Sequence, residues 1–186
     1  MQTINEYQGR LLNHFNALYR PGERRLALAL VEALGFAFSD TGFPSDSGET
    51  FVGVHPEPSD VDMQNNAFYI AEMLPEHLRY EKRLQALAES DAEVADALAG
   101  YRAKARSRPF GAPHIGIRYH SLQDLEAALG RVRAALGETL GERMHIAVYP
   151  PQSEAGTTQA FIHQDVIVSG NFLLGQLIEL QAQGAH

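Results

Sequence analysis

The chain has 186 residues, of which 45% are hydrophobic and 20% are charged, and its formal net charge is -8. This composition predicts an ordinary soluble chain, long enough to bury a core in one domain or two small ones. The acidic balance argues against a nucleic-acid partner, because phosphate binding needs a basic face. Without cysteine, the chain cannot form disulfides, use a catalytic thiol or bind metal through sulfur.

No stretch of the sequence predicts a membrane partner or a secretory signal. Every apolar run is interrupted by charge within about 18 residues, which is too short for a membrane span. The first residues, MQTINEYQGR, contain no apolar signal core, so we expect a cytoplasmic protein.

The first predicted elements are a strand and a helix. Residues 11–19 alternate as a strand does, which puts His14 and Asn16 on the same face. A turn follows, and residues 23–34 then repeat apolar positions at helical spacing, with Gly35 as the expected stop. Strand is therefore followed by helix.

Three more strands complete the first predicted module, which spans residues 1–74. We expect them over residues 36–39, 50–55 and 65–73, with a turn in the polar segment 40–48. The last of these strands carries Glu72 after an apolar run. The expected order is strand, helix and three strands.

Residues 75–108 depart from this pattern and predict a helical connector. One helix is expected over residues 76–89 and another over 90–108, with Ser90 and Glu93 as a capping box. The second helix ends in four cations, which suit either an anion-binding patch or a solvated helix end whose dipole favours positive charge. They are Arg102, Lys104, Arg106 and Arg108.

Residues 109–186 predict a second module. The strand over residues 113–120 places His114 and Arg118 on one face, and Ser121 with Asp124 predicts the start of a helix that ends at Gly137. The apolar stripe of this helix is Leu125, Leu129, Val132 and Leu136. Strands over residues 144–150, 159–168 and 172–180 follow.

Two histidines and two glutamates recur at corresponding places in the two halves. Aligning His14 on His114 superposes Tyr19 on Tyr119, and each half ends in a strand with one glutamate, Glu72 or Glu179. A charge within the apolar run that holds Glu179 is costly to bury unless something pairs with it. The two halves are therefore interpreted as an internal repeat.

Paired βαβββ modules with these four residues resemble the vicinal oxygen chelate superfamily, which includes glyoxalase I, extradiol dioxygenases and bleomycin resistance proteins. The resemblance implies an α+β protein whose two modules form a curved mixed sheet in one integrated domain, with the connector as an insertion. It also implies one divalent metal ion, held by His14, Glu72, His114 and Glu179. A small-molecule substrate and a homodimer are implied as well.

Two imidazoles and two carboxylates suit zinc, nickel, cobalt, manganese or iron(II), and they leave positions open for substrate oxygens. A metal acidifies a substrate that chelates through adjacent oxygens. The resemblance then implies a lyase or isomerase in which Glu72 or Glu179 carries the proton.

Other polar residues have two interpretations each. Asn16 and Arg118 are candidates for orienting the substrate or are simply part of a polar rim. His163 is a further candidate for binding the substrate. It shares a strand face with Asp165, and the two form either a relay or an exposed pair.

Two further functions stay open. His14, His114 and Glu179 would also satisfy the ligand set of an extradiol dioxygenase, with His163 as its acid-base residue. A metal-free protein of the same fold that binds a small molecule, such as an antibiotic, is the third possibility.

Overall fold

The computed structural model describes residues 14–61, 66–151 and 156–183. The first half contains β1 (Asn16–Tyr19), α1 (Arg24–Leu34), β2 (Ala37–Pro44), β3 (Thr50–His55) and β4 (Phe68–Glu72). The connector is α2 (Pro75–Ser90) and α3 (Ala92–Ser107). The second half contains η2 (Pro109–Gly111), β5 (His114–Arg118), α4 (Leu122–Leu140), η3 (Gly141–Arg143), β6 (His145–Tyr149), β7 (Thr157–Gln164) and β8 (Gln176–Gln183).

The two halves have the same sheet topology. The strand orders are β1-β4-β3-β2 and β5-β8-β7-β6. In each sheet the first strand runs parallel to the fourth, and the remaining neighbours are antiparallel. The α+β class and the duplicated βαβββ modules are therefore confirmed. Within the described residues the two sheets are separate, and one isolated bridge between Leu18 and Val168 links the halves.

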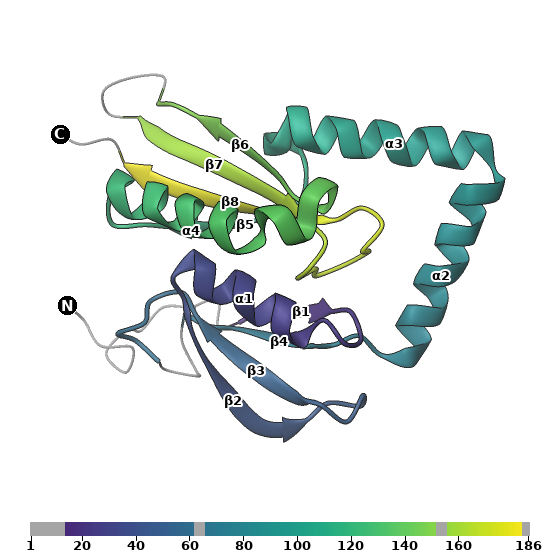
Figure 1. Cartoon of the computed structure of the whole chain (residues 1–186), viewed down its shortest axis with the longest axis horizontal. Coiled ribbons are helices and arrows are strands. Elements are labelled where there is room, and N and C mark those ends of the chain that lie inside the picture. The colour runs from purple at the N-terminus through teal and green to yellow at the C-terminus, as the bar shows by residue number, and fades with distance from the viewer. Residues whose placement is uncertain (1–13, 62–65, 152–155, 184–186) are drawn as a thin grey trace, which may run out of the picture.

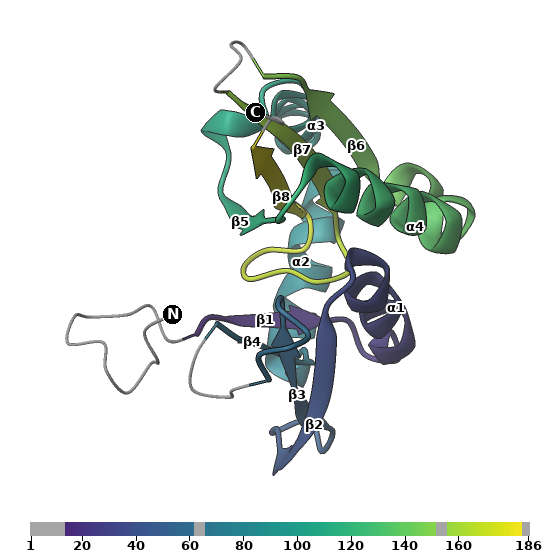
Figure 2. The same ribbon diagram turned by 90° about the vertical axis from the view of Figure 1, so that its left-hand side faces the viewer.

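Helices α1 and α4 lie side by side on one side of the molecule, while the two sheets open away from them (Figure 2). Hydrogen bonds tie the end of α1 to the second half: Tyr119 Oη donates to Leu34 O at 2.7 Å, and Arg131 Nε donates to Ala33 O at 3.0 Å. The main core lies around this helix pair and includes the expected stripe of α4.

The predicted end of the helix is confirmed in the first half but not in the second. Gly35 ends α1 with a φ of +85°, a conformation that glycine adopts without strain. In the second half, Gly137 does not end α4, which continues to Leu140 and stops at Gly141. The reason is that Leu140 is buried and extends the apolar stripe by one turn beyond Leu136.

The last strand begins later than predicted. Phe172 to Gly175 form a loop, and β8 starts at Gln176. The connector satisfies the backbone of this loop, because Glu81 accepts from Phe172 N at 3.1 Å and Arg102 donates to Leu173 O at 2.7 Å. An apolar run whose pattern predicts a strand is therefore held as a loop outside the sheet. Similarly, β2 continues to Pro44, through part of the segment predicted to be a turn.

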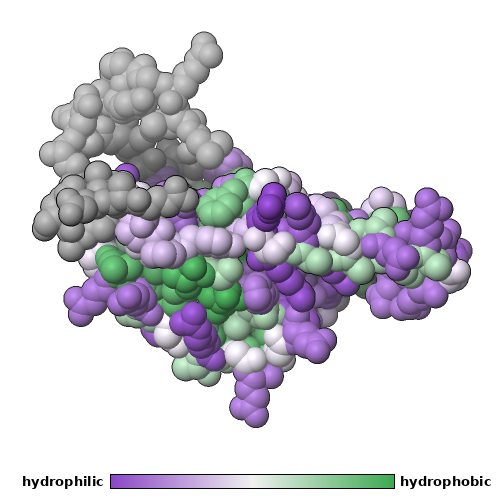
Figure 3. Space-filling model, turned by 90° about the horizontal axis from the view of Figure 1, so that it is seen from above, coloured by the Kyte–Doolittle hydropathy of each residue, from purple (hydrophilic) through white to green (hydrophobic). Residues whose placement is uncertain are grey.

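The connector leaves the first half as α2 and returns over the second half as α3 (Figure 1). Asp91 caps α3 by accepting from Glu93 N and Val94 N, so the predicted cap Ser90 is wrong by one residue. The Ser90 hydroxyl instead donates back to the carbonyls of Ala86 and Leu87. In the described parts of the chain, no helix combines the length and the apolar character needed to cross a membrane. Seen from above, the outer end of the connector is mainly hydrophilic, whereas hydrophobic side chains gather over the second half (Figure 3).

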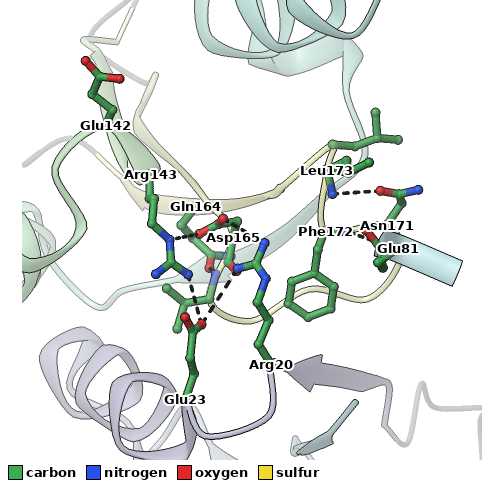
Figure 4. A network of polar contacts seen from close by, with 12 residues as sticks. Arg20, Glu23, Glu81, Glu142, Arg143, Gln164, Asp165, Asn171, Phe172 and Leu173 are labelled. Carbon is green, nitrogen blue, oxygen red and sulfur yellow. Dashed lines mark hydrogen bonds and ion pairs between the residues drawn. The ribbon is translucent and has the colours of Figure 1, made fainter. Parts of the chain in front are cut away.

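A cluster of four charged residues joins the halves below the connector (Figure 4). Arg143 contacts Asp165 at 2.8 Å and Glu23 at 3.0 Å, and Arg20 contacts Asp165 at 3.0 Å. Arg20 also lies over the ring of Phe172, 4.7 Å from its centre. Charges from the β1–α1 turn therefore pair with charges that flank the second sheet.

Candidate functional site

The second sheet has one face against α4 and an inner face turned away from it. Ile178, Leu180 and Ala182 of β8 lie in the core with α4. Since side chains alternate along a strand, Glu179 and Gln181 point to the inner face. His114 of β5 lies on the same face, because Gly116, two residues further, pairs in register with Glu179. The inner face therefore carries two of the predicted site residues next to each other.

His114 and Glu179 make direct contact. Their Nε2 and Oε2 atoms are 3.1 Å apart, and Glu179 is only 4% exposed. The carboxylate lies directly against β5, since a Cβ at Gly116 would stand 3.8 Å from Oε2, in ordinary van der Waals contact.

The hydrogen bonds around this pair orient both groups. His114 Nδ1 is 2.9 Å from Ala112 O. A carbonyl only accepts, so Nδ1 carries the hydrogen and Nε2 is directed at Glu179. The other carboxylate oxygen, Oε1, accepts from the side-chain amides of Gln159 at 2.5 Å and Gln181 at 2.7 Å. Hydrogen bonds to Nδ1 of His114 and to Oε1 of Glu179 therefore fix the orientation of both side chains.

This orientation leaves a position between Nε2 and Oε2 that only a positive group can occupy. Two lone pairs at 3.1 Å repel one another unless a proton or a metal ion lies between or beside them. Ligand bonds of about 2.0–2.2 Å place adjacent ligand atoms of one ion about 3 Å apart. A metal-bound histidine usually donates its other ring N–H to a carbonyl or carboxylate oxygen, as Nδ1 of His114 donates to Ala112 O. The pair suits a proton or a divalent ion.

His14 lies across the junction between the sheets. Its ring packs edge-on against Tyr69 of β4, with 5.1 Å between the ring centres. His14 and His114 line one cavity of about 460 Å³ between the residues that precede β1 and strand β5. Both predicted histidines therefore face the same space, although they come from different halves.

Glu72 lies on the opposite face of the first sheet. In the register of β1 with β4, Asn16 pairs with Tyr69 and Tyr19 with Glu72, so the position that Glu179 holds in the second sheet belongs to Tyr69 in the first. Glu72 is three residues further, an odd step that turns its side chain to the α1 side. There its Oε1 accepts from Gly22 N at 3.1 Å.

The four predicted ligands thus do not form one cluster. His114 and Glu179 touch, His14 shares a cavity with His114, and Glu72 faces elsewhere. Across residues 14–61, 66–151 and 156–183, no three histidine, aspartate or glutamate side chains stand close enough to share a metal ion.

The predicted substrate-binding residues are dispersed. Asn16 lines a cavity of about 620 Å³ on the first sheet together with His14 and Tyr69. Arg118 lies further along β5 and donates to Gln183 Oε1 at 2.7 Å.

His163 is buried apart from this site, at 5% exposure, and contacts Leu174 O through Nε2 at 3.1 Å. Burial lowers the pKa of His163, and the cations of Arg106 and Arg102 act in the same direction. Asp165 pairs with Arg20 and Arg143 instead of this histidine.

Two groups of residues at this site have no role assigned to them in the sequence analysis. Gln159 and Gln181 hold Glu179, and Phe110, Tyr149 and Phe161 form a ring cluster beside His114. Gln181 was visible as the residue two positions after Glu179, on the same strand face. The contribution of Phe110 could not be read from the sequence, because it comes from the connector side of the chain.

The duplicated βαβββ modules and their first-to-fourth strand pairing give this chain the α+β, glyoxalase-like fold that the sequence analysis expected. One similar solved structure is a glyoxalase/bleomycin resistance protein/dioxygenase family enzyme from Burkholderia phytofirmans PsJN, with 11% identity, 93% of this chain and 98% of that chain covered, and a TM-score of 0.44. Another is protein PA1353 from Pseudomonas aeruginosa, with 8% identity, 95% and 100% covered, and a TM-score of 0.47. Neither the family models nor the curated proteins gave a match to the sequence.

Proposed function

We propose that this protein is a metal-dependent enzyme of the vicinal oxygen chelate type that acts on a small substrate with adjacent oxygens. The single observation that supports it is the orientation of His114 and Glu179. Nε2 and Oε2 face each other at 3.1 Å, while Nδ1 and Oε1 are held by Ala112, Gln159 and Gln181.

The proposed ligand set is smaller than the sequence suggested. His114 and Glu179 fit a divalent ion by distance and orientation. His14 borders the same cavity and is the proposed third ligand, but it would have to move closer to bind the same ion, because the three side chains do not form a cluster in this structure. Glu72 does not fit, since it faces α1 and accepts from Gly22 N. We therefore assign Glu72 no part in the reaction.

A bound divalent ion would supply the Lewis acidity that favours loss of a proton from a carbon next to a coordinated oxygen. Glu179 is then the proposed proton carrier, because it is the carboxylate that contacts His114. The amides of Gln159 and Gln181 fix its plane, so that Oε2 keeps one direction toward the substrate. Asn16 and Arg118 are proposed to orient the substrate from the rims of the inner face.

A ring-cleaving dioxygenase is the second candidate, and the position of Glu72 favours it. With Glu72 outside the set, two histidines and one carboxylate remain, which is the donor set typical of non-haem iron(II) oxygenases. Oxygen uptake with catechols and deuterium exchange next to a carbonyl separate the two reactions. Oxygen consumption with ring opening would exclude proton transfer as the main activity.

Metal content tests the proposal directly. The protein is purified without chelator, and we expect about one equivalent of a divalent metal per chain, lost in His114→Ala and retained in Glu72→Gln. Glu72→Gln is the matched control, because it changes a glutamate of the other sheet face. A stable wild type without metal would contradict the proposal and favour the metal-free small-molecule binding protein.

A further inference from the structure

The four cations at the end of α3 separate into two pairs with different surroundings. Arg102 donates to Leu173 O at 2.7 Å, and Arg106 donates to Glu142 O at 3.1 Å. These two hold the connector to the second half. Lys104 of α3 and Arg108, which directly follows the last residue of α3, form no ion pair with any side chain in the described ranges.

Lys104 and Arg108 line a cavity of about 1330 Å³ between α3 and the inner face of the second sheet. Its volume exceeds that of most small-molecule sites, which hold about 300–1,000 Å³. Both side chains are exposed at its edge. Unpaired cations at the edge of a cavity in a chain of net charge -8 favour an anionic ligand.

One wall of this cavity is aromatic. The rings of Phe110 and Tyr149 are 4.9 Å apart, and Phe110 is 52% exposed. Phe110 also contacts Phe161 at 5.0 Å, and Phe161 contacts the His114 ring at 5.8 Å. Exposed rings in edge-to-face contact offer a flat apolar surface to an aromatic ligand.

The cavity adjoins the proposed site through Gln159 and Gln181. Both residues line the cavity, and both donate to Glu179 Oε1. A ligand that occupies the cavity therefore reaches the residues that hold the His114–Glu179 pair. The other end of the cavity lies at the end of α3, where Lys104 and Arg108 line it.

We propose that this cavity binds an aryl carboxylate, with its ring against Phe110 and Tyr149 and its carboxylate at Lys104 and Arg108. The inference deepens the proposed function, on which it rests for the claim that this ligand is the substrate. Binding itself needs only the cavity. The connector insertion then supplies the selectivity for anions.

Calorimetric titration of the full chain tests the proposal with 2-naphthoate and with 2-naphthylmethanol, a neutral molecule of similar size. Naphthoate binds about tenfold more tightly than the alcohol, because only naphthoate carries a negative charge that can pair with Lys104 and Arg108. The double variant Lys104→Gln/Arg108→Gln loses this preference and binds the alcohol as the wild type does. Phe110→Ala weakens both ligands.

Lys82→Gln/Arg83→Gln is the matched control, since it removes two exposed cations from α2 without touching the cavity. Circular dichroism verifies that each variant is folded. Equal affinity for the two ligands, an unchanged preference in Lys104→Gln/Arg108→Gln, or an equal loss in the control would overturn the proposal.

The same titration in His114→Ala separates this inference from the proposed function. Naphthoate affinity persists there, whatever the metal content. A metal-free wild type that prefers naphthoate through Lys104 and Arg108 would contradict the metal-dependent enzyme and support the anion site. A metal-containing protein without that preference would do the reverse.

Discussion

At the scale of single residues, the site depends on how one buried carboxylate is accommodated. Glu179 is 4% exposed, and its Oε1 atom accepts from two side-chain amides while its Oε2 atom contacts His114. Buried carboxylates are costly unless hydrogen-bonded. The amides of Gln159 and Gln181 therefore both stabilise the fold and fix the orientation of Glu179, the candidate metal ligand.

We predict that Gln159→Leu lowers the free energy of unfolding by about 1–3 kcal/mol, because it removes a donor from a buried charged group. Urea denaturation measures the change. Gln123→Leu is the control, since Gln123 lies at an exposed position of α4. Equal stability of Gln159→Leu and the wild type would contradict the role assigned to this amide.

His163 predicts a pH dependence of stability. Burial lowers the pKa of His163 below its ordinary value of 6.5, so the unfolded chain takes up a proton at a higher pH than the folded chain does. Its contribution is present above about pH 6.5 and is lost as the pH falls from there toward the lowered pKa. Unfolding free energies at pH 7.5 and 5.5 should therefore differ more in the wild type than in His163→Gln. A larger difference in the variant would contradict this.

At the scale of elements, the connector decides where the last strand begins. Glu81 of α2 is 7% exposed and accepts from Phe172 N, and Arg102 of α3 donates to Leu173 O. Phe172 itself is 2% exposed and packs with Met73 and Val168. Two helices that are distant in sequence thus hold this apolar segment as a loop.

Glu81→Ala is expected to destabilise the protein by about 1–3 kcal/mol, because the buried Phe172 N–H loses its acceptor. Faster amide exchange at Phe172 is the local measurement, and chemical denaturation is the global one. Lys82→Ala, a change at the exposed neighbouring position, should leave both values nearly unchanged. Unaltered exchange in Glu81→Ala would show that the contact does not hold the loop.

At the scale of the whole molecule, the relative position of the two halves brings His14 and His114 to one cavity. That position depends on the packing of α1 against α4, the bridge between Leu18 and Val168, and the cluster formed by Arg20, Glu23, Arg143 and Asp165. The charges of this cluster are partly exposed, so each pair is worth little by itself and the network counts as a unit.

Arg143→Met should lower the free energy of unfolding by about 1 kcal/mol, because Glu23 and Asp165 each lose a cation. The difference from the wild type should shrink at high salt, which screens exposed charges. Thermal or urea unfolding at two salt concentrations provides the measurement. Arg133→Met, at an exposed position of α4, is the control and should show no such dependence.

Local sequence patterns determined the order of the elements, the repeated βαβββ modules and the stripe of α4. Alternation and helical spacing express which side of an element is buried, and this information lies within each segment. The same alternation placed His14 with Asn16 and Glu179 with Gln181. Gly35 was found because a left-handed helix end favours glycine.

The tertiary structure alone decided what depends on strand register and on distant partners. Aligning the two halves of the sequence matched Glu72 with Glu179. The register of β1 with β4 shows instead that Tyr69 holds the position equivalent to Glu179, and Glu72, three residues further, points to the other face of the sheet. The end of α4 depended on the burial of Leu140, and the start of β8 on contacts with the connector. Short-range periodicity carries no information about such contacts, because their partners lie far away in the chain.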